Sequence, residues 1–111
     1  MEITIIYDNV KETREINTVD YLKDELLEFA GFFIPEAAPD AVELLNQGFY
    51  DDLIDELEEF FVKDFFIIAK KFFLEIKKIY SMNTMDEITG EFDTLNDIFK
   101  EAGFNVEYSV E

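Results

Sequence analysis

Hydrophobic and polar residues alternate near both ends of the chain and repeat with a helical period between them. Residues 2–7 alternate, which is typical of a half-buried strand. Asp8-Asn9 then supplies turn chemistry, so we expect residues 14–19 to return as the second strand of a hairpin. Residues 104–110 alternate as cleanly, and the simplest arrangement pairs them with that hairpin.

The first part of the middle segment carries apolar residues at steps of three and four. Thr18 or Asp20 can cap a helix that runs to about Phe33, and Pro35 must stop it because proline cannot join the helical hydrogen bonds. Pro39 can begin a short helix that reaches residue 45. These signals predict two helices before residue 48.

The longest apolar repeat covers residues 49–80, which contain neither Gly nor Pro. It predicts one long helix or two helices with a bend near residues 62–64, and the sequence leaves both open. Residues 65–74 are apolar on more than one face, so we expect this part to be the most buried helix.

A last helix is expected between residue 84 and Gly103. Asn83 or Thr84 can cap it, and Glu87 stands three residues after Thr84, as in a capping box. Gly103 can end it. The pattern as a whole predicts an α+β fold, in which a small antiparallel sheet of the N-terminal hairpin and the C-terminal strand packs on four to five helices.

Composition fits one folded domain and excludes most catalytic chemistry. The chain has 111 residues, 49% of them hydrophobic, including 13 Phe, which is enough for a single core spanning residues 1–111. It has no His and no Cys, so there is no imidazole base, no thiolate nucleophile and no common transition-metal site. The two serines lie outside any nucleophile elbow, and the four glycines form no phosphate loop. We therefore expect no enzyme and no cofactor.

Calcium binding is the remaining metal chemistry to consider in a chain so rich in carboxylates. An EF-hand loop needs Gly at its sixth position. A loop starting at Asp8 has Thr13 there, and one starting at Asp86 has Glu91. We expect no metal site.

The net negative charge of this sequence is unusually large. It contains 27 Asp and Glu against 9 Lys and Arg, a net charge of −18, whereas small domains usually carry a magnitude of about 2–8. Halophilic and highly soluble proteins are also acidic, although a halophile would seldom keep so many Phe. The charge is polarised: residues 62–81 carry +3 and the rest of the chain −21.

Two clusters of acids without any base stand out. Residues 40–59 contain eight Asp and Glu, and most of those after residue 50 follow helical spacing opposite the apolar stripe. Successive helical turns lie about 5.4 Å apart, a spacing similar to that of phosphates. We call this first set the acidic ladder; it consists of Asp51, Asp52, Asp55, Glu56, Glu58 and Glu59. The second set, the companion cluster, consists of Asp86, Glu87, Glu91, Asp93 and Asp97.

Like charges one helical turn apart weaken a helix. A ladder that is present despite this cost suggests that its carboxylates have a functional role. The plain alternative is that the acids are the solvated face of an amphipathic helix. The charge layout of residues 40–59 and 84–101 resembles that of the small DNA-mimic inhibitors of bacteriophages and mobile elements, which include anti-CRISPR, anti-restriction and uracil-DNA glycosylase inhibitor proteins. The resemblance implies an inhibitor that occupies the basic nucleic-acid-binding site of a target protein.

This resemblance also implies a setting and a kind of partner. We expect a basic protein partner such as a nucleic-acid-binding enzyme or nuclease, with no direct binding to nucleic acid. No targeting segment is visible and the longest apolar run has five residues, so we expect no membrane and a cytoplasmic location in a bacterial or phage-infected host cell.

Two other functions remain open. An immunity or antitoxin protein that masks a basic toxin would use the same electrostatics. A homodimeric interaction module could use surplus aromatic residues, although ordinary core packing is the preferred interpretation of them. The aromatic residues concerned are Phe32, Phe33, Phe65, Phe66 and Phe73.

Overall fold

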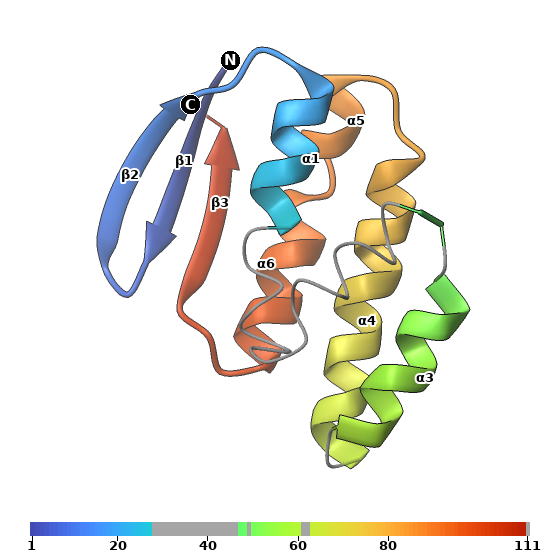
Figure 1. Cartoon of the computed structure of the whole chain (residues 1–111). Coiled ribbons are helices and arrows are strands. Elements are labelled where there is room, and N and C mark those ends of the chain that lie inside the picture. The colour runs from blue at the N-terminus through green and yellow to red at the C-terminus, as the bar shows by residue number, and fades with distance from the viewer. Residues whose placement is uncertain (28–46, 49, 61–62, 111) are drawn as a thin grey trace.

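The fold is α+β, with a three-stranded antiparallel sheet on one side and helices on the other (Figure 1). It is taken from a computed structural model that describes residues 1–27, 47–48, 50–60 and 63–110. The side chains of residues 50, 53, 56, 57 and 60 lie outside that description. The described elements are β1 (Glu2–Tyr7), β2 (Val10–Glu15), α1 (Val19–Leu27), α3 (Tyr50–Phe60), α4 (Lys63–Tyr80), α5 (Met85–Thr89), α6 (Phe92–Glu101) and β3 (Val106–Val110).

The N-terminal hairpin closes with a two-residue turn. Asp8 and Asn9 both have positive φ, 48° and 69°, a conformation that Asp and Asn tolerate and that matches the twist of paired strands. β2 therefore starts at once, with Val10 opposite Tyr7. The expected second strand of the hairpin is present, but it spans Val10–Glu15 rather than residues 14–19. Its start was misplaced because β2 is a charged edge strand without the apolar alternation that marks a half-buried one.

Strand β1 lies at the centre of the sheet, with order β2-β1-β3. The expected pairing of the C-terminal strand with the hairpin is confirmed: β3 runs antiparallel to β1 and places Val110 opposite Ile3. The side chain of Asn96 on α6 occupies the outer edge of β3. Its amide donates to the Tyr108 carbonyl at 2.9 Å and accepts from the Tyr108 N–H at 2.8 Å, so another strand cannot pair there without displacing it.

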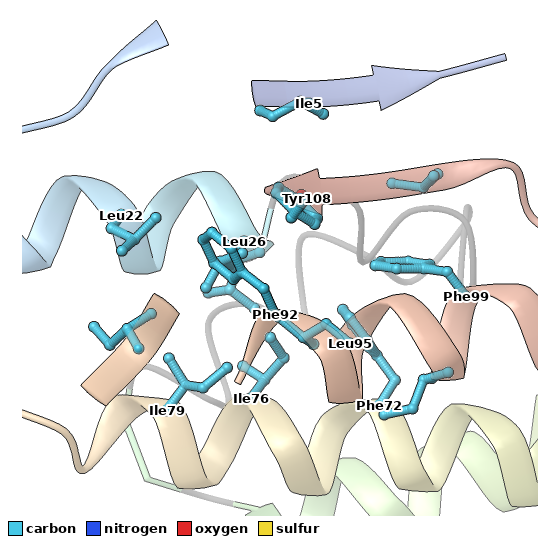
Figure 2. Packing of buried hydrophobic residues seen from close by; sticks show 14 of the residues in the cluster. Ile5, Leu22, Leu26, Phe72, Ile76, Ile79, Phe92, Leu95, Phe99 and Tyr108 are labelled. Carbon is cyan, nitrogen blue, oxygen red and sulfur yellow. The ribbon is translucent and has the colours of Figure 1, made fainter. Parts of the chain in front are cut away.

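One hydrophobic core fills the space between the sheet and the helices (Figure 2). Rings from different elements meet within it: the centroids of Phe72 and Phe99 lie 5.5 Å apart, as do those of Phe92 and Tyr108. Helices α1, α4 and α6 each contribute several buried side chains. The labelled residues in Figure 2 are Ile5, Leu22, Leu26, Phe72, Ile76, Ile79, Phe92, Leu95, Phe99 and Tyr108.

The expected packing of four to five helices on the sheet is not matched. Three helices build the core with the sheet, whereas α3 packs against α4 and the five-residue α5 buries one side chain, Ile88, with Met85 partly buried beside the core. The repeat over residues 49–80 forms two described helices, α3 and α4, that lie side by side (Figure 1). The expected helix starting near Pro39 and the expected end of α1 near Phe33 lie outside the described residues.

The helix caps follow local side-chain chemistry. The hydroxyl of Thr18 accepts from the N–H of Tyr21 at 3.2 Å and caps α1. Gly103 has φ 83° just after α6, where the next residue's N–H bonds back to Phe99, so the predicted stop is confirmed.

The predicted single helix from residue 84 to Gly103 is instead two helices. It is interrupted at Gly90, whose N–H bonds to the Asp86 carbonyl, and the N–H of Glu91 turns back to Ile88. Glycine is a poor helix former, and the interruption redirects the chain so that α6 can pack on both α4 and β3.

Candidate functional site

The acidic ladder lies along one exposed face of α3. Its five described side chains are all exposed, and none forms an ion pair with another described residue. They fall within about a third of the helix circumference at 3.6 residues per turn. Ile54 is half-buried and packs on the core, which holds α3 in place with the carboxylates outward. The side chain of Glu56, the sixth member, lies outside the described part of the structure.

The companion cluster is divided between the surface and the fold. Glu87 closes the predicted capping box: its N–H donates to the Thr84 hydroxyl at 3.2 Å, and that hydroxyl donates to the Glu87 carboxylate at 2.9 Å. Glu91 precedes α6, where the Lys78 ammonium lies 3.0 Å from its carboxylate. The remaining members, Asp86, Asp93 and Asp97, are exposed.

The fold does not bring the two acidic clusters into one site. Figure 1 places α4 between α3 and α6, and each of these two helices packs against α4. Asp93 and Asp97 instead line a hollow of about 600 Å³ at the start of β3, together with Lys100 and Asn96. The ladder is therefore a surface of α3 alone.

Helix α4 carries a net positive charge, and some of its lysines form ion pairs within the fold. Lys71 lies 3.2 Å from Glu101, and Lys78 pairs with Glu91, so both lysines tie α4 to α6. Lys63 and Lys70 are exposed on another side of α4, where neither forms an ion pair with a described residue. These charges thus stand on a different helix from the ladder.

Glu75 carries a buried carboxyl group that was not predicted from the sequence. Only 8% of it is exposed, and its Oε1 atom has no hydrogen-bond partner among the described residues. Burial, and secondarily the neighbouring Glu91 carboxylate, raise its pKa to about 7, against a smaller opposite effect of Lys78. Hydrogen bonds from Glu75 and Lys78 lower the pKa of Glu91. Below about pH 7, a protonated Glu75 and a cationic Lys78 can therefore share Glu91 as their anionic partner.

The signal for Glu75 was present in the pattern. Glu75 stands where an apolar residue would continue the core stripe, after Ile68 and Phe72 and before Ile79, at steps of three and four. A carboxyl group at a core position needs a partner, but the partner, Glu91, stands just before another helix and could not be identified from the sequence.

The aromatic residues considered for a dimer surface belong to the core where the structure describes them. Phe73 is fully buried, and Phe65 and Phe66 are partly buried against the core. Phe32 and Phe33 lie outside the described residues. Core packing therefore accounts for the three described rings.

The described ranges hold no group of three or more Asp and Glu arranged to bind a metal ion. None of the helices described is long and apolar enough to cross a membrane. Comparisons with protein-family models, curated proteins and solved structures gave no match to this chain.

Proposed function

We propose that this protein is a non-enzymatic inhibitor that uses the acidic ladder of α3 to occupy a basic nucleic-acid-binding site on a target protein. Its mode of action is that of anti-CRISPR and anti-restriction proteins that mimic DNA. The observation that carries the proposal is the row of exposed carboxylates on α3. None of them pairs with another described residue, although the neighbouring helix α4 carries lysines.

Charge density supports this assignment. Asp51 and Glu59 are eight residues apart, a rise of about 12 Å along the helix. The five ladder carboxylates whose side chains are described give one charge per about 3 Å over that length, similar to the about 3.4 Å per phosphate along one DNA strand. A groove lined with Lys and Arg for nucleic acid would therefore meet a comparable line of negative charge on a rigid helix.

The test is capture from host lysate at low and high salt, followed by competition between an oligonucleotide and the captured protein. The ladder variant carries Asp52→Asn, Asp55→Asn, Glu58→Gln and Glu59→Gln. The control variant changes net charge equally at exposed acids elsewhere, with Glu2→Gln, Asp20→Asn, Asp24→Asn and Glu107→Gln.

We expect a basic protein to be captured at low salt and released at high salt or by the oligonucleotide. The ladder variant should lose it and the control variant should keep it. Capture that is indifferent to salt and to the ladder changes would contradict the proposal. If the captured protein is a toxin rather than an enzyme of defence or repair, the same surface would define an immunity protein.

A further inference from the structure

A hollow of about 380 Å³ lies between α4 and α6, on other helices than the acidic ladder. We call it the α4–α6 hollow. Two buried residues, Glu75 of α4 and Ile98 of α6, form its floor. Its rim consists of exposed residues of the same two helices: Lys71, Leu74, Thr94, Asp97 and Glu101. Both the volume and the mixture of apolar side chains with a few polar groups are typical of small-molecule sites, which occupy about 300–1,000 Å³.

The carboxyl group of Glu75 is the feature of this hollow that packing does not explain. Glu75 is only 8% exposed, and its Oε1 atom has no hydrogen-bond partner among the described residues. A buried acceptor without a donor lowers stability, because it has lost its hydrogen bonds to water and gained none in return. A ligand that donates a hydrogen bond to Glu75 would remove this cost.

The charges around the hollow favour a donor that is positively charged. The only lysine of the rim, Lys71, is already engaged by Glu101, whose carboxylate lies 3.2 Å away. Asp97 forms no ion pair with another described residue. Once Lys71 is paired, the hollow therefore retains two carboxyl groups, those of Asp97 and Glu75, and it attracts a cation.

The apolar part of the lining selects the rest of the ligand. Leu74 at the rim is 53% exposed, and Ile98 at the floor offers a second apolar surface. We propose that the α4–α6 hollow binds a free organic cation, an ammonium or guanidinium group carried on a short apolar stem. The cationic group donates to the carboxyl groups of Glu75 and Asp97, and the stem covers the two apolar residues. An inorganic cation lacks the stem, and an anion has the wrong charge.

Such a ligand couples its binding to the protonation of Glu75. Burial and the Glu91 carboxylate raise the pKa of Glu75 to about 7, whereas a bound cation favours the ionised form. Binding should therefore tighten by at least about tenfold as pH rises from about 5.5 to about 8.5, and it should release protons below about pH 7. The other charged groups around Glu75 are Lys78, which also acts on its pKa, and the rim residues Lys71, Asp97 and Glu101.

The test is a titration with n-butylammonium chloride, followed by NMR of protein labelled with carbon-13 at its Ile and Leu methyl groups. Spectra are recorded at several pH values and constant ionic strength. Leu74 and Ile98 report from within the hollow, and Ile67, exposed on α4 but outside the hollow, is the internal control. Ammonium chloride supplies the charge without the stem, and n-butanol supplies the stem without the charge.

Three variants separate the contributions of the carboxyl groups. Glu75→Gln removes the titrating group at the floor, and Asp97→Asn removes the carboxylate at the rim. Asp93→Asn is the matched control for the second change, because Asp93 is exposed on the same helix and does not line this hollow. Circular dichroism melting checks that each variant folds.

We expect the methyl signals of Leu74 and Ile98 to shift saturably, with a dissociation constant on the order of millimolar, while the Ile67 signal stays in place. Ammonium chloride and n-butanol should each bind at least about tenfold more weakly, since each lacks one half of the contacts. Glu75→Gln should abolish the pH dependence and weaken binding at high pH by about tenfold. Asp97→Asn should weaken it by about threefold or more, and Asp93→Asn by less.

Shifts that are equal at Ile67 and in the hollow, and that ammonium chloride reproduces, would show only general attraction of cations to an acidic protein and would overturn the inference. So would the absence of saturable shifts up to about 100 mM, or a pH dependence that persists in Glu75→Gln. If Glu75→Gln does not fold, equal binding by Asp97→Asn and Asp93→Asn is the outcome that rejects the site. None of these measurements involves the acidic ladder or its target, so the result is independent of the proposed function.

Discussion

The two acidic clusters look alike in the sequence but differ in what the fold does with them. The ladder on α3 faces solvent, and its five described carboxylates have no cationic partner among the described residues. In the companion cluster, Glu87 completes a helix cap and Glu91 holds Lys78 and Glu75. Acidic density alone therefore does not identify a binding surface, since some carboxylates are already engaged within the protein.

The largest expected difference between the clusters is in affinity for the target. Neutralising four ladder residues, Asp52, Asp55, Glu58 and Glu59, should weaken binding by about a hundredfold or more, because several charge contacts are lost together. Neutralising Asp86, Asp93 and Asp97 should weaken it by less than about threefold, as expected for charges at the rim. Titrating the captured target with each variant measures both affinities. Equal losses would show that the clusters act as one surface.

The next effect is a pH dependence of stability that arises from Glu75. Its pKa is raised from 4.5 to about 7, so between these values the folded protein binds more protons than the unfolded chain. Stability is therefore greatest below about pH 4.5 for this group and falls as pH rises to about 7, by on the order of 2–3 kcal/mol. Denaturant unfolding at several pH values measures it.

Glu75→Gln is the matched variant for this prediction. The Gln amide can donate to Glu91 as the protonated carboxyl does, but it does not titrate. The difference in unfolding free energy between wild type and variant should therefore change over that pH range, because the variant lacks the titration of Glu75 and its effect on Glu91. The charged groups that face Glu75 are Glu91 and Lys78, which act on its pKa, and Lys71, Asp97 and Glu101, which line the same hollow. A constant difference would contradict the assignment.

Removing the shared partner should cost somewhat less. Glu91→Ala leaves buried Glu75 without its hydrogen-bond acceptor and removes a link between α4 and α6, so we expect a loss of about 2 kcal/mol in unfolding free energy. Asp93→Ala, at an exposed neighbouring position, should change it by less than about 0.5 kcal/mol. Similar losses from both variants would show that the contacts of Glu91 with Lys78 and Glu75 add no stability, as for an ordinary surface residue.

The smallest effect concerns the capping box of α5. Thr84→Ala removes the hydroxyl that accepts from the Glu87 N–H, and about 1 kcal/mol of stability should be lost. Thr84→Ser keeps the hydroxyl and should restore most of it. Thermal unfolding of the three proteins decides between a working cap and an incidental contact.

Features encoded by neighbouring residues could be predicted from the sequence. The strands at residues 2–7 and 106–110, the cap at Thr84 and the stop at Gly103 each depend on local periodicity or local hydrogen bonds. The early start of β2 was missed because an edge strand needs no apolar alternation. The interruption at Gly90 was missed because it serves the packing of α6 on its neighbours.

In the candidate site, too, local features could be predicted from the sequence and contacts between distant segments could not. Helical spacing predicted the exposure of the α3 carboxylates, because they stand opposite an apolar stripe on the same helix. The engagement of Glu91 with Lys78 and Glu75 depends on the contact between α4 and α6, and no local pattern contains it. Contacts between distant segments decide which acids remain available to a partner.

The dependence of target affinity on salt tests the central claim most directly. The logarithm of the association constant should fall steeply with the logarithm of salt concentration for the wild-type protein and the companion-cluster variant. The slope should be much shallower for the ladder variant, because fewer charges then take part in binding. Equal slopes for the wild-type protein and the ladder variant would contradict the claim that the acidic ladder of α3 is the binding surface.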